Sequence, residues 1–272
     1  MRVSIITPVL NGAKFLNATL DSVEAQSYPD WQHFVMDGGS TDGTLEILER
    51  RAAQEPRLTY VSRPDDGQYD ALLAGFDQAA DGLIGWLNAD DIYAPWAVEE
   101  AVRNAKGDNA PRWISGLPAL WDAAGCLRAI HATAWRPRSA IRKGYFHDDF
   151  LGCLQQEAIF FHTSLFQDLT EAERECVRSQ RLAGDFALWR AFAERSPLVT
   201  LPVVLGGFRV HAHNRSVRQT EAYQAEIRAL GGPMPARWLA RRLRTAFELV
   251  SSARNVWAFR KAALELSGAV DA

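Results

Sequence analysis

Short apolar runs rich in β-branched residues alternate with amphipathic stretches over the first hundred residues. Residues 3–9 are largely apolar or β-branched, and the apolar side chains after them recur at helical spacing at Phe15, Leu16, Leu20 and Val23. The same succession predicts strands over 34–36, 58–61 and 83–87 and helices over 44–53 and 69–80. Because strands that alternate with helices pair in parallel, this pattern predicts an α/β fold with a mostly parallel central sheet flanked by helices.

Beyond Pro95 the alternation loosens. Strands are predicted over 113–116, 126–130 and 157–162, one or two more over 198–210, and a helix over 183–194. The irregular stretch 135–154 is typical of a binding surface, and residues after 219 are helical by periodicity. The pattern predicts a domain over 1–215, divided near residue 100 into two halves (1–100 and 101–215), and a helical extension over 216–272.

Composition and charge narrow the class of protein. The chain has 272 residues and 47% hydrophobic content, enough for a substantial core, and its net charge of -3 argues against a nucleic-acid binder with a uniformly basic surface. Cys126, Cys153 and Cys176 lack the spacing of a zinc site, which favours reduced thiols. The first residues form a strand rather than a signal peptide, and no apolar run approaches the roughly 18 residues that span a bilayer. We therefore expect a cytoplasmic protein whose contact with a membrane is peripheral.

Two adjacent acids follow the apolar run 83–87, in the segment Asn88-Ala89-Asp90-Asp91. A buried strand that ends in this way brings the acids to the carboxyl edge of a sheet, where α/β proteins bind ligands. Carboxylate oxygens suit Mg²⁺ or Mn²⁺, and such a cation would neutralise a diphosphate leaving group. The alternative is a pair of N-cap residues ahead of Pro95.

Two further loops rich in Asp and Gly follow predicted strands, at 37–44 and 63–71. Glycines allow the backbone to approach a ligand closely, and a strand-end Asp can accept hydrogen bonds from a ribose or a base. Taken singly, each loop is equally consistent with a tight turn before a capped helix. Both would lie at the same sheet edge as residues 88–91, and this convergence favours a ligand site.

Four segments, 3–8, 37–43, 66–71 and 86–91, resemble in order and spacing the motifs of the family 2 inverting glycosyltransferases with the GT-A fold. The resemblance covers residues 1–215, and it implies that 1–100 bind a nucleotide sugar and that 101–215 bind the acceptor. It implies a UDP-sugar as donor, with a GDP- or dTDP-sugar as alternatives, together with Mn²⁺ or Mg²⁺. The reaction implied is a single displacement with inversion at the anomeric carbon.

The resemblance also implies roles for individual residues. Asp185, in the segment 184–189, matches the family's general base, which deprotonates the acceptor hydroxyl, with a helix N-cap as its alternative role. The metal ligands implied are Asp90, Asp91 and His211, and for His211 a structural role is the alternative. The donor contacts implied are Thr7, Pro8, Asp37, Gly39, Asp66, Tyr69, Asp70, Asn88, Asp90 and Asp91. The acceptor contacts implied are Gln155, Gln156, Glu157 and Trp189.

Two positions depart from the family pattern. Many relatives carry a second Asp where this chain has Gly38, and that acid helps to read the base. The metal motif begins with Asn88 in place of Asp, which leaves Asp90 as the direct ligand and Asp91 as a sugar contact or a supporting residue.

The C-terminal extension differs in charge from the rest of the chain. Residues 235–266 carry seven basic and two acidic side chains, a net charge of +5 against -8 elsewhere. Apolar residues recur there at helical steps between arginines, at Trp238, Leu239, Leu243, Phe247, Val250 and Trp257. Residues 236–261 are therefore predicted to form a basic amphipathic helix, which either lies on an anionic membrane surface, packs on the domain or joins two copies of the chain.

The resemblance implies transfer of a hexosyl or N-acetylhexosaminyl group to a saccharide acceptor, linked to a polyprenyl lipid, in bacterial surface-polysaccharide assembly. The cytoplasmic face of the inner membrane is the place where such an acceptor would be met. Two alternatives remain: a nucleotidyltransferase acting on sugar phosphates, and a non-catalytic relative that serves as a partner subunit. The joint presence of Asp90, Asp91 and Asp185 argues against the second, because a binding subunit needs neither metal ligands nor a base.

Overall fold

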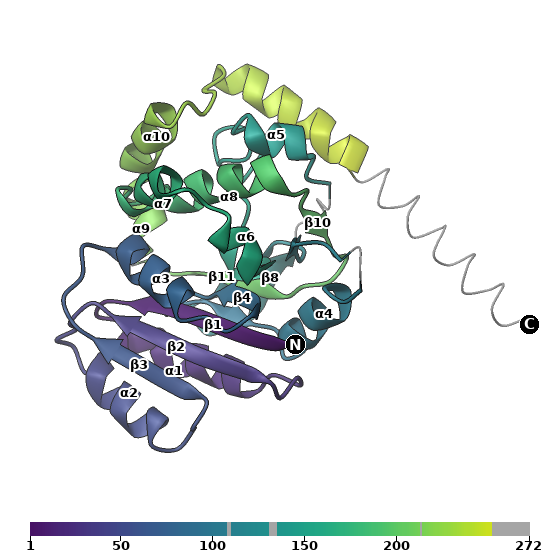
Figure 1. The fold of residues 1–272 in the computed structure, drawn as a ribbon. Coiled ribbons are helices and arrows are strands. Elements are labelled where there is room, and N and C mark those ends of the chain that lie inside the picture. The colour runs from purple at the N-terminus through teal and green to yellow at the C-terminus, as the bar shows by residue number, and fades with distance from the viewer. Residues whose placement is uncertain (108–109, 131–134, 213, 252–272) are drawn as a thin grey trace, which may run out of the picture.

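The computed structural model describes residues 1–107, 110–130, 135–212 and 214–251 and centres on a seven-stranded sheet in the order β10-β6-β9-β4-β1-β2-β3 (Figure 1). β1 pairs in parallel with both β2 and β4, and β2 pairs in parallel with β3. β9 runs antiparallel between β4 and β6, so the predicted parallel sheet is confirmed for its first four strands and becomes mixed beyond them. The strands are β1 (Arg2–Val9), β2 (Trp31–Asp37), β3 (Leu58–Ser62), β4 (Gly82–Trp86), β6 (Trp113–Ser115), β9 (Ile159–His162) and β10 (Val199–Thr200).

Helices cover both faces of this sheet. Leu16, Leu48 and Val98 come from three helices that pack on one face, where they bury the apolar side of β1, β2 and β4. Phe76 and Phe192 come from helices on the opposite face and pack in the largest core cluster with Trp86 of β4. The first group is α1 (Ala13–Glu24), α2 (Thr44–Ala52) and α4 (Ala97–Asn104); the second includes α3 (Gln68–Asp77), α6 (Thr163–Gln167), α7 (Glu171–Arg178) and α8 (Gly184–Arg195).

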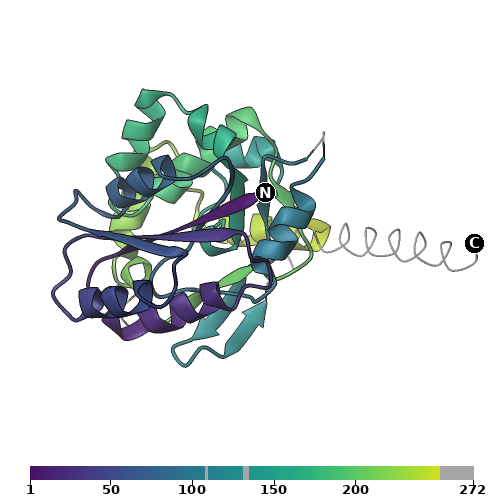
Figure 2. The ribbon, with the colours of Figure 1, turned by 60° about the horizontal axis from the view of Figure 1, so that its bottom comes forward.

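A second, four-stranded sheet has the order β5-β11-β7-β8, and its teal strands project beside α1 in Figure 2. It is built from β5 (Ile92–Tyr93), β7 (Ala119–Asp122), β8 (Leu127–Ile130) and β11 (Gly206–Val210). β11 passes against the short 3-10 helix η1 (Gln156–Ala158), and a Cβ at Gly206 would lie 2.1 Å from the backbone oxygen of Glu157. Glycine at this position therefore allows the close approach that brings the end of β11 next to the residues after β4.

The segment 135–154 contains one short helix, α5 (Arg138–Arg142), in an otherwise irregular path. α7 has no counterpart in the sequence-based prediction, although Thr170 and Glu173 form a capping box at its start. α9 (Arg215–Arg218) and α10 (Thr220–Ala229) follow the second sheet, and residues 237–251 form a further helix. The predicted extension of this helix to residue 261, with Trp257, lies outside the described residues.

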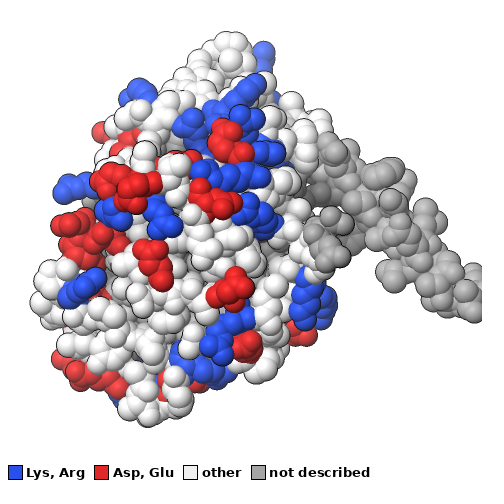
Figure 3. Space-filling model, in the orientation of Figure 1, with Lys and Arg blue, Asp and Glu red and all other residues white. Residues whose placement is uncertain are grey.

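Over the described part of the chain no helix combines the length and the apolar character needed to cross a bilayer. Acidic and basic side chains are interspersed over the face shown in Figure 3. The three cysteines are free thiols, as their spacing predicts.

Candidate active site

The loops after β1 and β2 are tied together at the carboxyl edge of the sheet. The Asn11 N–H donates to Ser40 Oγ at 2.7 Å, and Asn11 Oδ1 accepts from the Thr41 N–H at 2.9 Å. The Gly12 N–H donates to Thr44 Oγ1 at 3.0 Å. Asn11 has a φ of 54°, a left-handed conformation that Asn tolerates better than most residues. The two loops therefore form one braced rim.

Asp37, at the end of β2, is buried beneath this rim. Its Oδ2 accepts from the Gly39 N–H at 3.2 Å and from Ser62 Oγ at 2.6 Å, and its Oδ1 accepts from Ser40 Oγ. The carboxylate is thus engaged by donors of the protein itself. It fixes the loop that contains Gly39 and links the end of β2 to the end of β3.

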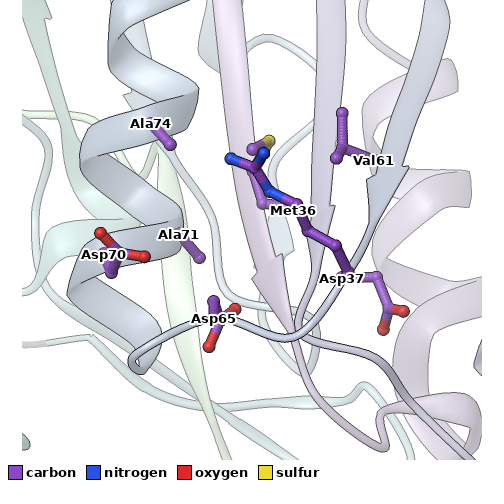
Figure 4. A pocket seen from close by; sticks show the side chains of 8 residues that line it. Met36, Asp37, Val61, Asp65, Asp70, Ala71 and Ala74 are labelled. Carbon is purple, nitrogen blue, oxygen red and sulfur yellow. The ribbon is translucent and has the colours of Figure 1, made fainter.

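A small pocket opens between the ends of β2 and β3 and the start of α3 (Figure 4). Asp65 lies between Asp70 on α3 and Asp37, and a Cβ at Gly38 would lie 2.8 Å from Asp65 Oδ2. Burial raises the pKa of the Asp65 carboxyl, and the charges of Asp70 and Asp37 raise it further. Asp65 therefore takes the space that a side chain at position 38 would need. The lining residues are Met36, Asp37, Val61, Arg63, Asp65, Asp70, Ala71 and Ala74.

Asp90 and His211 meet at the surface beside this edge, although 121 residues separate them. Asp90 Oδ2 lies 2.9 Å from His211 Nε2, and the Phe15 ring stacks on the imidazole at 4.3 Å between centroids. The pairing of β11 with β5 brings His211, just after β11, back to the residues that follow β4.

The Asp90–His211 pair suits a divalent cation that takes its remaining ligands from a bound phosphate and water. A carboxylate and an imidazole are a donor set that accepts Mn²⁺, and Mg²⁺ is commonly held by one or two carboxylates plus substrate phosphates. No group of three or more His, Cys, Asp or Glu side chains in the described ranges is arranged to hold a metal by itself. The protein would therefore supply two ligands, and the site would be completed by the substrate.

Asp91 faces inward, unlike its neighbour. It is fully buried, its Oδ1 accepts from the Arg209 N–H at 2.9 Å, and its Oδ2 lies 3.4 Å from Asn88 Nδ2. Burial raises the pKa of Asp91, and the charges of Asp90 and Glu157 raise it further. The Asp91 carboxylate thus joins β11 to the segment after β4, as expected of a supporting residue, and its direct binding to the metal stays a prediction.

Arg209, on β11, carries a buried guanidinium close to Asp90. Its side chain lies over the Phe15 ring at 5.2 Å, and two of its nitrogens have no hydrogen-bond partner among the residues that the structure describes. Burial lowers the pKa of Arg209, while the charges of Asp91 and Asp90 oppose that change. A buried cation that lacks acceptors is costly, and an anionic ligand beside Asp90 would supply them.

Asp185 lies in the first turn of α8, where the segment before it is firmly held. Glu226 of α10 accepts from the backbone N–H groups of Leu182 and Ala183 at 3.0 and 2.8 Å. A Cβ at Gly184 would lie 2.6 Å from the ring of Tyr69, so glycine allows α8 to begin against α3. Burial raises the pKa of Asp185 to about 7, and the charge of Asp148 adds to the increase. A carboxylate with this pKa is well matched to proton transfer near neutral pH.

Glu157 lies in η1, which contacts β4, β5 and β11. It is fully buried, and neither carboxyl oxygen has a hydrogen-bond partner in the described part of the chain. Burial raises the pKa of Glu157 to about 8, with contributions from the charges of Asp90 and Asp185. Burial therefore favours the neutral form of the Glu157 carboxyl.

Comparison with known proteins identifies the family. A model described as glycosyl transferase family 2 matches residues 4–112. An uncharacterised glycosyltransferase of Rickettsia prowazekii is 32% identical over 230 residues, which cover 82% of this chain and 69% of that protein. The chain belongs to glycosyltransferase family 2.

Other family members are longer than this chain. Chondroitin synthase of Escherichia coli is 24% identical over 224 residues, covering 80% of this chain but 30% of that protein. An uncharacterised Nostoc glycosyltransferase is 30% identical over 103 residues, covering 38% of this chain. The chain thus spans about a third of the length of these two relatives, 30% and 32%.

Solved structures show the GT-A fold. TarS of Staphylococcus aureus, residues 1–349, has a TM-score of 0.59 at 14% identity, covering 91% of this chain and 70% of that one. A mannosyltransferase of Pyrobaculum calidifontis, solved with GDP-Man and Mn²⁺, has a TM-score of 0.54 at 19% identity, covering 99% of this chain and 79% of that one. Likeness at these identities shows the fold, which agrees with the GT-A prediction.

Several residues of this family 2 chain that are predicted to contact substrates have buried side chains. Thr7 is buried, with Oγ1 2.8 Å from His33 Nε2, and Tyr69 is 4% exposed and donates its hydroxyl to the Leu182 oxygen at 2.6 Å. Trp189 is 3% exposed in the main core. These side chains and that of Glu157 are enclosed by protein. Their direct contact with donor or acceptor stays a prediction.

The remaining predicted residues lie nearer the surface. Gln155 Oε1 accepts from the Ala119 N–H at 3.0 Å, and Asn88 Oδ1 accepts from Trp86 Nε1 at 2.9 Å, so both side chains also brace loops. Gly39, Asp66, Asp70, Asn88, Gln155 and Gln156 are partly or fully exposed, whereas Pro8 is buried in β1.

Sequence reasoning missed two residues that the geometry brings forward, Arg209 and Asp65. Arg209 lies on β11 two residues before His211, which follows the end of the strand. The alternation of side chains along an extended chain is the signal that could have placed Arg209 on the same side as His211. Asp65 lies in a segment whose residues are typical of a turn, so its composition did not single it out. The one signal in the sequence is the glycine at position 38, which leaves space for the Asp65 side chain.

Proposed function

We propose that this protein is a metal-dependent inverting glycosyltransferase that moves a sugar from a nucleoside diphosphate to a saccharide acceptor. The observation that carries the proposal is the Asp90–His211 pair, whose Oδ2 and Nε2 atoms lie 2.9 Å apart although 121 residues separate them in the sequence. Asp90 and His211 would hold the cation, which supplies charge neutralisation to the leaving diphosphate.

The proposed reaction is one displacement at the anomeric carbon. The acceptor hydroxyl oxygen forms a bond to this carbon while the bond from the carbon to the diphosphate oxygen breaks. The hydroxyl proton passes to the carboxylate of Asp185, and the electron pair of the broken bond leaves with the nucleoside diphosphate. Arg209 lies where its unpaired donors would hydrogen-bond that diphosphate.

The donor and acceptor classes are narrower proposals. A UDP-sugar is the proposed donor, and GDP- and dTDP-sugars are the alternatives. A solved structure of TarS contains UDP-GlcNAc, and that of the mannosyltransferase contains GDP-Man. The proposed acceptor is a growing surface polysaccharide linked to a polyprenyl lipid, and the likeness to a chondroitin synthase supports a polysaccharide product. Gln156, at the start of η1, is the proposed acceptor contact.

A screen of nucleotide sugars for release of nucleoside diphosphate tests the proposed reaction. We expect release from one donor class with Mn²⁺ or Mg²⁺ and loss of release when a chelator is added. The measurement is a coupled assay for the nucleoside diphosphate. Pyrophosphate release from a nucleoside triphosphate and a sugar phosphate would instead indicate nucleotidyl transfer and would overturn the proposal.

Asp65 is the proposed reader of the nucleobase. Asp37 is engaged by protein donors. Asp65 accepts from the Gly67 N–H through Oδ1, whereas its Oδ2 has no hydrogen-bond donor among the described residues and lies beside Gly38 at the pocket. Asp65→Asn should weaken binding of the preferred nucleoside diphosphate by about tenfold, because an N–H of the base loses a charged acceptor. Calorimetry with UDP, GDP and dTDP measures the change, with Asp81→Asn, an exposed acid remote from this edge, as control. Equal affinity of Asp65→Asn and the parent for every nucleotide would remove Asp65 from this role.

A further inference from the structure

The helix over 237–251 has two different faces. Ala240, Phe247 and Ser251, at steps of seven and four residues, turn toward the domain, and the Phe247 ring stacks with Trp135 at 5.4 Å and meets Phe146 at 5.7 Å. Arg244, from the same side, donates from Nε to the Phe150 oxygen at 2.8 Å. One face therefore anchors the helix on the segment around α5, at the outer edge of the molecule (Figures 1 and 2).

The opposite face leaves large apolar side chains in solvent. Trp238 is 63% exposed and Leu249 is 67% exposed, and the other members of this face are Leu239, Leu243 and Val250. Leu239, Leu243 and Val250 recur at steps of four and seven residues, and Trp238 and Leu249 lie eleven residues apart. They form two neighbouring apolar rows, which together make a broad stripe that contains Arg242. Such a stripe on an anchored helix is unusual for a surface that meets only water.

Arginines lie within and beside the stripe. Arg237, Arg241 and Arg242 are exposed, Glu248 is the exposed acid of the helix, and Arg242 lies over the Trp238 ring at 5.7 Å. The helix over 237–251 carries four arginines and one acid, so a contact between two copies of it would bring two net positive charges together. At a bilayer surface the Arg242 side chain reaches the lipid phosphates while the tryptophan and leucines enter the acyl boundary.

We propose that residues 237–251 dock this protein on an anionic lipid surface, with the stripe of Trp238, Leu239, Leu243, Leu249 and Val250 inserted and Arg237, Arg241 and Arg242 on the phosphates. Packing on the domain and contact with a membrane are thus compatible, because they use opposite faces of one helix. The proposal is independent of the sugar-transfer proposal, but it would hold the active site near a lipid-linked acceptor.

Vesicle co-sedimentation of the full chain tests the docking. The parent should bind vesicles that contain phosphatidylglycerol and bind phosphatidylcholine vesicles far more weakly. Trp238→Glu combined with Leu243→Glu should lower the affinity for the anionic vesicles by more than about tenfold. Replacing Arg237, Arg241 and Arg242 with Gln should lower it by roughly fivefold for each arginine and remove the preference for anionic lipid.

The matched control is Leu127→Glu with Ile130→Glu, which places two charges on exposed apolar positions of β8, 45% and 49% exposed. This control should keep vesicle binding. Circular dichroism and nucleoside diphosphate binding confirm that each variant is folded, and their failure would concern the fold or the sugar-transfer proposal rather than docking. A parent that does not bind anionic vesicles overturns the proposal. So does a parent dimer in light scattering that the helix variant converts to a monomer while vesicle binding is unaffected.

Discussion

Asp185→Asn is expected to lower kcat for sugar transfer by about a thousandfold while leaving the affinity for nucleoside diphosphate almost unchanged. The amide cannot accept the acceptor's proton, but it preserves the shape of the side chain and the oxygen that accepts from the Phe186 N–H at 2.7 Å. Single-turnover assays for chemistry and calorimetry for nucleotide binding separate the two effects. Transfer by the variant at more than about a tenth of the parent rate would exclude Asp185 as the base.

The pH dependence of kcat/KM provides a second readout for the same residue. A general base acts in its deprotonated form, so activity should rise with pH through the Asp185 pKa of about 7 and then level off. Asp148→Asn is an informative control, because the charge of exposed Asp148 disfavours ionisation of Asp185. This variant should remain active and shift the rising limb to lower pH, whereas Asp185→Asn should lose the limb altogether.

The sequence predicted the regular half of the fold and the edge at which the site lies. The strands around Ile5, Val35 and Ile84 are apolar enough to be recognised locally, and the Asp and Gly loops after them follow from turn chemistry. Parallel pairing then places all the strand ends on one edge. Because each of these signals is local, no knowledge of distant contacts was needed.

The orientation of individual side chains was beyond the same reasoning. Asp90 and Asp91 are identical neighbours in sequence, and only the return of β11, with the Arg209 N–H directed at Asp91, decides which one faces outward. Tyr and Trp side chains occur both in ligand sites and in protein cores, so the sequence does not distinguish the two roles for Tyr69 and Trp189. In the structure both side chains pack in the main core cluster. The helix over 237–251 is a similar case. Its periodicity predicts an apolar stripe, but it does not predict that Phe247, on the other face, packs against Trp135 and Phe146.

Asp90→Asn should abolish metal-dependent activity, with a loss of about a thousandfold or more in kcat/KM that added Mn²⁺ does not restore. The amide is a poor ligand for a divalent cation, and His211 alone would not hold the cation that neutralises the leaving diphosphate. Mn²⁺ binding in the presence of nucleoside diphosphate should weaken in parallel. The melting temperature without metal should change little, because the Asp90 side chain is 32% exposed and makes its main contact with His211.

Asp91→Ala provides the contrast, because the two adjacent acids are expected to fail in different ways. Removing the buried Asp91 carboxylate leaves the Arg209 N–H without its acceptor, which should destabilise the fold by about 1–3 kcal/mol in denaturant unfolding. Asp90→Asn should spare stability and lose metal binding. If instead Asp91→Ala loses metal binding at unchanged stability, Asp91 turns outward to the cation when substrate binds, and the division of labour inferred from burial is wrong.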